Sequence, residues 1–258
     1  MNLALRFLGV GSAQAVDLGS SGAVLERDGA PLLLIDCGPE TLNRYLDIYG
    51  EAPRSLYITH THMDHVAGLE RLFYRAYFDP TLKGNVNLFA HAALLPHLQG
   101  RVADYPNVIA EGGANFWDAF HLVPCSRGFW YAGLWFDVFP TRHHAPMTSF
   151  GIALQGVFAW TGDTRPIPEM LAQFAPEPAL IAHDCGLVGN PSHTGVDDIE
   201  REYTKEQRSR LLLYHYASAA DGAALAAHGY RVAQRNERIA LPAPGADVVP
   251  VGTSKAMA

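Results

Sequence analysis

The chain has 258 residues, of which 48% are hydrophobic and 17% charged, and its formal net charge is −7. This composition predicts one large globular domain with a sizeable core and excludes general disorder. The acidic balance, without a basic run, offers no electrostatic footprint for nucleic acid, and no stretch approaches the roughly 18 apolar residues of a membrane span.

Three cysteines lie far apart in the chain, at Cys37, Cys125 and Cys185. They are too few for a disulfide scaffold, and their odd number leaves one without a partner. The N-terminus lacks a basic segment followed by a long apolar stretch, so we expect no signal peptide. The simplest interpretation is a cytoplasmic protein with reduced cysteines.

The first half of the chain alternates short apolar runs with glycine-rich turns, a pattern typical of strands. Strands are expected over residues 3–8, 23–26, 32–35, 55–59 and 86–90. Apolar positions at helical spacing predict helices over residues 66–77 and 93–98. The stretch 100–133 is irregular and aromatic. It forms either a loop-rich edge of the core or the aromatic wall of a substrate pocket.

The second half is again rich in strands that alternate with helices. Strands are expected over residues 135–139, 150–154, 158–161, 179–183, 211–215 and 230–233, and helices over 168–174, 196–203 and 222–228. After Asn236 the sequence turns to Pro, Gly, Ala and Ser, which predicts a flexible tail. We therefore expect one domain over residues 1–235, a tail over 236–258, and two packed sheets with helices outside, a four-layered αβ/βα sandwich.

Four potential metal ligands crowd together directly after one expected strand. Thr59 is followed by His60, His62, Asp64 and His65. Imidazole and carboxylate groups are ligands for zinc, and they also serve manganese or iron. Without a metal, such a cluster would suffer repulsion when protonated and lose solvation when buried. The cluster therefore predicts a metal site.

The pattern His60-x-His62-x-Asp64-His65 resembles the HxHxDH motif of the metallo-β-lactamase superfamily. The likeness extends along most of the chain, and it is similar to the branch of ribonuclease Z and related phosphodiesterases. The further matching segments are residues 7–12, 34–38, 64–69 and 161–164, His183-Asp184, Ser192-His193-Thr194 and Tyr214-His215-Tyr216.

This resemblance implies a dinuclear metal-dependent hydrolase with the αβ/βα sandwich fold. It implies two divalent metal ions, zinc or else manganese or iron. The first metal would be held by His60, His62 and one histidine of the His143–His144 pair, for which His143 is the better match. The second would be held by Asp64, His65 and His215, with Asp163 bridging the two.

The resemblance also suggests how the site would work. Two metals can share a hydroxide, and Asp64 can orient it and accept its proton. His193 is the candidate proton donor to the leaving oxygen, although an ordinary exposed loop histidine is the alternative. Asp36, His183 and the unused His144 are expected to support the ligands through hydrogen bonds or to line the pocket.

The substrate is less defined by the sequence. Ribonuclease Z proper carries a long basic arm that grips transfer RNA, whereas the basic residues between His65 and His143 are few and scattered. This departure argues against a large RNA and favours a phosphodiester in a small or short nucleotide, with Arg165 as a candidate phosphate contact.

Three alternatives stay open, and with them the question of partners. They are a lactone or thioester hydrolase with an apolar pocket that includes Trp117 and Trp130, a transfer-RNA 3′-processing endonuclease, and a non-catalytic metal-dependent sensor. A small-molecule substrate and no membrane partner are expected. Related enzymes are often dimers, which makes a homodimer a candidate state.

Overall fold

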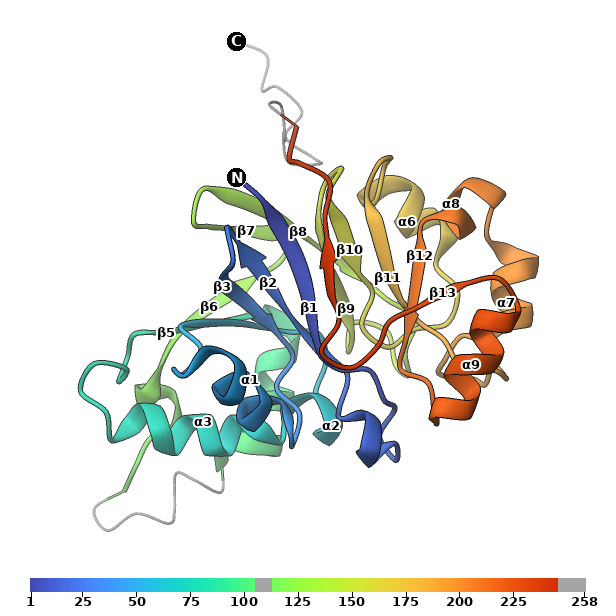
Figure 1. Cartoon of the computed structure of the whole chain (residues 1–258). Helices are drawn as coiled ribbons and strands as arrows, with labels where there is room; N and C mark the ends of the chain where they lie inside the picture. The colour runs from blue at the N-terminus through green and yellow to red at the C-terminus, as the bar shows by residue number, and fades with distance from the viewer. Residues whose placement is uncertain (105–112, 246–258) are drawn as a thin grey trace.

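The computed structural model describes residues 1–104 and 113–245. Within them, two seven-stranded mixed sheets pack face to face, and helices cover both outer faces (Figure 1). This arrangement is the four-layered αβ/βα sandwich that the sequence predicts. The first sheet runs in the order β14 (Arg238–Ala240), β1 (Leu3–Gly9), β2 (Gly22–Arg27), β3 (Ala30–Ile35), β4 (Ser55–Ile58), β5 (Val86–His91) and β6 (Phe120–Cys125).

The second sheet repeats the plan with the second half of the chain. Its order is β13 (Arg231–Val232), β12 (Leu211–Tyr214), β11 (Leu180–Asp184), β10 (Phe158–Trp160), β9 (Phe150–Leu154), β8 (Leu134–Pro140) and β7 (Gly128–Tyr131). Strands β10 to β13 pair in parallel, as do β3 to β6 in the first sheet. Parallel strands send their carboxyl ends to one edge, where ligands bind in open α/β sheets.

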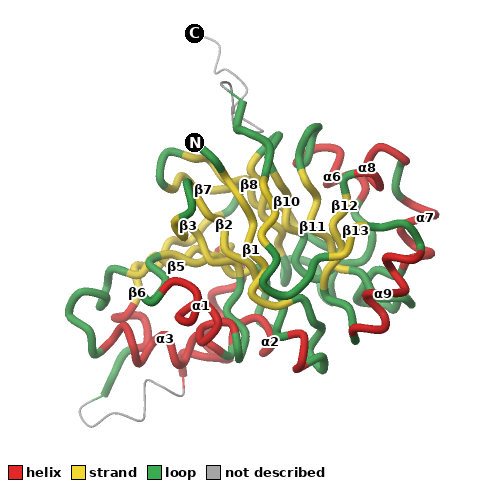
Figure 2. The backbone as a smooth tube through the Cα atoms, in the orientation of Figure 1, coloured by secondary structure: helices red, strands yellow, loops and turns green. Residues whose placement is uncertain are grey.

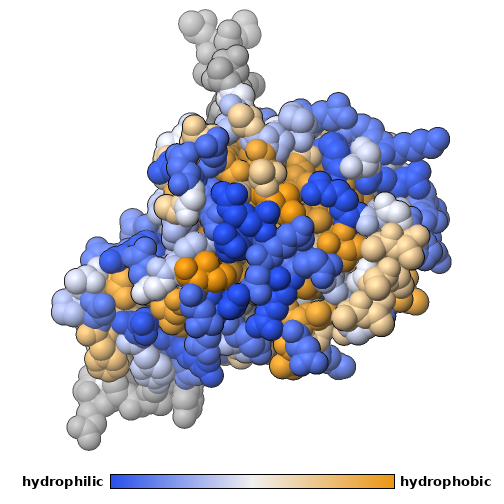
Figure 3. Space-filling view, in the orientation of Figure 1, coloured by the Kyte–Doolittle hydropathy of each residue, from blue (hydrophilic) through white to orange (hydrophobic). Residues whose placement is uncertain are grey.

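Helices lie outside the two sheets, in red in Figure 2. Helices α1 (Thr41–Tyr49), α2 (Met63–Val66), α3 (Gly68–Tyr77) and α4 (Leu95–Leu98) belong to the first half. Helices α6 (Pro168–Phe174), α7 (Val196–Glu202), α8 (Lys205–Ser209) and α9 (Ala219–Ala227) belong to the second. In Figure 3 the alanine-rich α9 forms a pale apolar area beside a hydrophilic centre. No helix among the described residues is long and apolar enough to cross a membrane.

Strand alternation explains why two hydrophobic cores form. In β1, Leu5 and Phe7 face the second sheet, and the Phe7 ring lies 5.6 Å from that of Trp160 between centroids. In β4, Tyr57 joins the same core, whereas Leu56 and Ile58 point to the other face and pack beneath α1 and α3. Because side chains alternate along a strand, one sheet contributes to both cores.

The C-terminal boundary expected from the sequence is wrong. Strand β14 pairs antiparallel with β1, so the domain extends past residue 235. Arg238 Nε donates to the buried Glu26 Oε2 at 2.6 Å, and Arg6 and Tyr49 donate to Oε1 at 2.7 Å each. These pairs anchor the last strand, so its polar composition does not make it free. Residues 246–258 lie outside the described part.

Two further elements depart from the expectations. The aromatic stretch 100–133, described except for residues 105–112, contains β6 and β7, the neighbouring edge strands of the two sheets. The segment between β3 and β4, for which no helix was expected, forms α1. Its buried side chains Leu42 and Tyr45 pack into the outer core of the first sheet.

Candidate metal centre

The loops that follow four strands bring the expected ligands to one edge of the sandwich. His60 and His62 follow β4, His143 follows β8, Asp163 follows β10 and His215 follows β12. Backbone hydrogen bonds hold these loops together across the two sheets. Phe150 N donates to Thr59 O at 2.9 Å, and His215 N donates to Val10 O at 2.7 Å.

A first group of ligand atoms consists of His60, His62, His143 and Asp163. The Nδ1 atom of His62 lies 3.2 Å from His60 Nε2 and 3.1 Å from His143 Nε2. The Oδ2 atom of Asp163 lies 3.5 Å from His60 Nε2. Four donor atoms thus converge on one point, as ligands do around a tetrahedral ion.

A second group consists of Asp64, His65, Asp163 and His215. Asp163 Oδ1 lies 3.3 Å from His65 Nε2, and its Oδ2 lies 3.3 Å from His215 Nε2. Asp64 Oδ2 lies 3.5 Å from His65 Nε2 and 3.6 Å from His215 Nε2. Because Asp163 belongs to both groups, its carboxylate is placed to bridge two ions.

The outer nitrogen of each of four ligand histidines is held by an acceptor, which turns Nε2 inward. His60 Nδ1 is 3.0 Å from Thr59 Oγ1, and His143 Nδ1 is 2.9 Å from Ser192 O. His65 Nδ1 is 2.8 Å from Asp36 Oδ2, and His215 Nδ1 is 3.3 Å from Asp184 Oδ1. Such partners fix the tautomer and orientation of metal-ligating imidazoles.

Several buried polar atoms in the second group make no hydrogen bond within the described chain. They are His65 Nε2, His215 Nε2 and Asp163 Oδ1, all facing the same point. Buried polar atoms normally find partners, because an unpaired one costs about 1–3 kcal/mol. Imidazole nitrogens and a carboxylate oxygen so arranged fit a divalent metal ion, which would satisfy all three.

The two groups differ in electrostatics. Burial lowers the pKa of His60 well below its usual value and that of His143 to about 4. Burial also disfavours charge on His65 and His215, but carboxylates outweigh it. Asp163 and Asp36 raise the pKa of His65 well above its usual value, and Asp163 and Asp184 raise that of His215 to about 10. The second group therefore attracts positive charge more strongly.

The backbone is strained where ligands and their supports sit. Asp36 has φ of 60° and His215 has φ of 68°, a left-handed conformation that non-glycine residues rarely adopt. Gly38 lies so close to the loop after β4 that a Cβ atom there would come within 2.1 Å of Asp64 O. Such strain is typical of sites where geometry serves function rather than stability.

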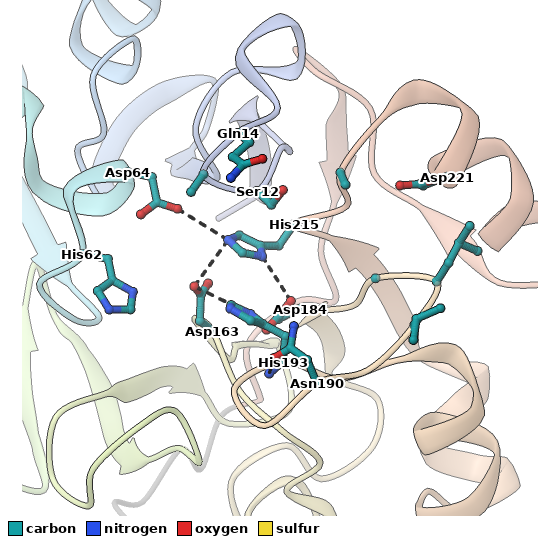
Figure 4. Close-up of a pocket in the computed structure, with 15 residues that line it drawn as sticks. Ser12, Gln14, His62, Asp64, Asp163, Asp184, Asn190, His193, His215 and Asp221 are labelled. Carbon is teal, nitrogen blue, oxygen red and sulfur yellow. Dashed lines mark hydrogen bonds and ion pairs between the residues drawn. The ribbon is translucent and has the colours of Figure 1, made fainter.

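The ligand cluster opens into a cavity of about 570 Å³. His62, Asp64, Asp163 and His215 line its inner side, and the His193 ring lies beside that of His215 (Figure 4). His193 Nδ1 bonds Asp184 Oδ2 at 2.9 Å. Although burial opposes it, this bond and the charge of Asp184 raise the pKa of His193.

Asp184 is the main residue that the sequence analysis did not select. Besides His193 and His215, it accepts a hydrogen bond from Thr164 N at 2.9 Å. It thus connects the candidate proton donor, one ligand and the loop that carries Asp163. The signal was present, since Asp184 follows the singled-out His183 in a matching segment, but only its neighbour was chosen.

The residues expected to support the ligands behave differently from one another. Asp36 bonds His65 Nδ1 and also Thr59 N and Oγ1, at 2.8 Å each. The His183 ring bonds Asp184 O and Tyr203 OH, so it supports the Asp184 backbone rather than a ligand. His144 packs against His62 and lies 3.2 Å from Ser192 Oγ, outside both ligand groups.

The expected substrate contacts do not meet at this cavity. Arg165 lines a separate, smaller cavity with Arg142 and Arg201. The Trp117 indole donates to Gln99 Oε1 at 2.6 Å, and Trp130 is 61% exposed on the edge strand β7, where it contacts Trp135. None of the three lines the cavity at the ligand cluster, so they are not substrate contacts there.

Comparison with known proteins places these features in context. The family model described as anti-Pycsar protein Apyc1 matches residues 3–239. An anti-Pycsar protein Apyc1 of Saccharibacillus brassicae is 30% identical over 222 residues, covering 83% of this chain and 89% of the relative. Another, from Paenibacillus harenae, is 30% identical over 191 residues, covering 71% of this chain and 77% of that relative.

Solved structures share the fold at lower sequence identity. The metallo-β-lactamase fold protein YhfI of Bacillus subtilis superposes with a TM-score of 0.71 at 14% identity, covering 93% of this chain and all of its own. Human tRNase Z, short form, superposes with a TM-score of 0.66 at 19% identity and the same coverage. The metallo-β-lactamase fold, typical of metal-dependent hydrolases, is thereby confirmed.

Proposed function

Because this chain belongs to the anti-Pycsar protein Apyc1 family, we propose that it is a dinuclear metal-dependent phosphodiesterase that hydrolyses a small cyclic or short nucleotide. The observation that carries the proposal is the pair of ligand groups joined through Asp163, facing an open cavity. Paired metals in this arrangement are typical of phosphate-ester hydrolases.

Seven side chains would hold the two ions. His60, His62 and His143 serve the first, Asp64, His65 and His215 the second, and Asp163 both. When bound, two divalent ions supply Lewis acidity and an acidified water molecule. The metal is proposed to be zinc, with manganese or iron as alternatives, since all accept imidazole and carboxylate ligands.

Two residues of the chain would move protons. The Asp64 carboxylate lines the cavity and can accept a proton from the attacking water. His193 faces the cavity from the other side, and its Nδ1 is oriented by Asp184, which leaves Nε2 for the leaving oxygen. An alkoxide leaving group needs such a donor, which contributes about 10²–10⁴-fold to the rate.

One observation favours a second candidate, hydrolysis of a lactone or thioester. Leu187 and Val188 give one wall of the cavity apolar character, and Val188 is 84% exposed. The same ligand groups would serve that reaction. Transfer-RNA processing is not favoured, because the described residues lining the cavity include no lysine or arginine to bind a phosphate backbone.

The test is hydrolysis by purified protein whose metal content has been counted. Bis(p-nitrophenyl) phosphate, cyclic CMP and a γ-lactone would be assayed with zinc or manganese, and with chelator as control. We expect turnover of the diesters that chelator abolishes. Turnover of the lactone alone would replace the proposal with the second candidate. Two bound metals without any turnover would point to a sensor.

A further inference from the structure

The cavity beyond the ligand cluster has three distinct walls. Ser12, Ala13 and Gln14, from the loop after β1, form one; Gly186, Leu187 and Val188, after β11, form another. Asp221, in the first turn of α9, lies at the far side and faces the metal centre (Figure 4). A substrate group bound to the metals must extend between the first two walls toward Asp221.

Charge in this cavity is distributed unusually for a phosphate enzyme. Apart from the ligands and their neighbours Asp184 and His193, Asp221 is the one charged group among the described residues lining it. The Asp221 carboxylate makes no hydrogen bond or ion pair to another described residue; its backbone N alone bonds the capping Ser218 Oγ. A second phosphate would meet no cation here and would be repelled by this carboxylate.

We propose that this part of the cavity binds a single nucleobase that bears an exocyclic amino group, cytosine or adenine, and that Asp221 selects it. The inference rests on the proposed phosphodiesterase function. Leu187 and Val188 offer an apolar wall for one face of the base, while Gln14 lies on the opposite side. The substrate class is then a cyclic mononucleotide with one phosphate.

The chemistry of a carboxylate gives the selectivity its direction. An ionised carboxylate only accepts hydrogen bonds, so it can pair with the amino group of cytosine or adenine. Uracil and hypoxanthine place a carbonyl oxygen at the same position, and two acceptors repel. A site built to bond one partner discriminates strongly against the analogue that leaves its group unpaired.

Asp221 also has a structural explanation, because acidic residues stabilise the first turn of a helix. Base selectivity separates the two explanations, since loss of helix stability would affect all substrates alike. The experiment compares the metal-loaded wild type with Asp221→Asn on two substrate pairs, cyclic CMP against cyclic UMP and cyclic AMP against cyclic IMP. Asp197→Asn is the matched control, as Asp197 lies on α7 outside the lining of this cavity.

We expect the wild type to prefer the amino-bearing member of each pair by about tenfold or more in kcat/KM, because hydrogen bonds to charged groups contribute about 1.5–3 kcal/mol. Asp221→Asn should bring both ratios close to one and leave turnover of bis(p-nitrophenyl) phosphate unchanged. Asp197→Asn should keep the wild-type ratios.

Two results would overturn this inference while sparing the proposed function. One is a wild type that hydrolyses both members of each pair equally. The other is an Asp221→Asn variant that retains the preference. If the metal-loaded wild type hydrolyses neither cyclic nucleotides nor bis(p-nitrophenyl) phosphate, the proposed function itself fails. The assay on the base-free diester therefore distinguishes the two failures.

Discussion

The two ligand groups share Asp163, yet the chain supports them in different ways. In the first group, His60 and His143 are held by neutral oxygens, those of Thr59 and Ser192. In the second, His65 and His215 are held by the buried carboxylates of Asp36 and Asp184. A carboxylate behind an imidazole makes it a stronger ligand and attracts the cation itself.

This difference predicts an order of metal binding. The second group offers two ligand carboxylates and two supporting ones, whereas the first shares Asp163 and otherwise presents imidazoles with neutral supports. We therefore expect the second group to hold its ion more tightly. The predictions below test that contrast, beginning with the change that removes it altogether.

Asp163→Ala should abolish the contrast, because both groups lose the carboxylate they share. We expect loss of both metals and a fall in diester turnover of at least about 10³-fold, since metal catalysis contributes several kcal/mol. Elemental analysis after dialysis, together with the turnover rate, measures both. A variant that keeps two metals per chain would show that Asp163 is not the bridge.

His193→Ala separates proton donation from metal binding. The variant should retain both metals, because His193 contacts the centre mainly through Asp184. Turnover of a cyclic nucleotide, whose alkoxide needs a proton, should fall about 10²–10⁴-fold. Bis(p-nitrophenyl) phosphate, with its good leaving group, should be affected far less. An equal loss on both substrates would remove His193 from this role.

Asp36→Asn weakens the support of the second group only. Its loss should lower metal affinity there by about 10–100-fold, with a much smaller effect on the first group. Competition with a chelating dye resolves the two binding steps. Asp47→Asn is the matched control, because Asp47 is 68% exposed on α1, far from any ligand. Equal weakening of both steps would contradict the assignment of Asp36 to one group.

Thr59→Val is the corresponding change in the first group. Thr59 Oγ1 donates to Asp36 Oδ2 at 2.8 Å and can accept from His60 Nδ1, so valine removes a neutral support while keeping the shape. We expect a loss of affinity of about tenfold or less, below that of Asp36→Asn. If the two variants weaken binding equally, charge is not the source of the contrast.

Glu26→Gln asks whether any buried carboxylate matters to the metals. Although burial opposes it, hydrogen bonds from Arg6, Arg238 and Tyr49 hold the pKa of Glu26 below its usual value. The ionised form therefore stabilises the fold above the unfolded-state pKa near 4.3, and this stability is lost as pH falls through the lower folded-state pKa.

At neutral pH the Glu26→Gln variant should lose about 1–3 kcal/mol of unfolding free energy, a difference that shrinks in acid. Denaturant unfolding at pH 7 and pH 3.5 measures both values. Metal affinity should stay at the wild-type level, since Glu26 lies far along β2 from the ligands. A weaker metal site would mean that strand anchoring, rather than local charge, controls the centre.

The sequence predicted much of this molecule because its strands and ligands carry local signals. Helix α1 was missed although Leu42, Tyr45, Leu46 and Tyr49 repeat at helical spacing, a signal that polar neighbours obscured. Strand β14 has no apolar alternation. It forms because β1 offers an unpaired edge and Glu26 binds Arg238, which are contacts between residues distant in sequence.

The candidate site shows the same division. The crowded histidines after β4 indicated the ligands directly, because a short loop keeps them together. The cavity walls could not be predicted, since Gln14, Val188 and Asp221 meet only when three loops converge. For the same reason Trp117 and Trp130, chosen for their aromatic character, lie elsewhere in the fold.

Stepwise metal reconstitution tests the central claim most directly, that two unequal ligand groups joined by Asp163 form one catalytic centre. Metal-free protein would receive zinc in fractional equivalents while bound metal and hydrolysis of cyclic CMP are measured together. We predict that the first equivalent binds more tightly but yields little activity, and that activity rises with the second. Full activity at one equivalent per chain would contradict the claim.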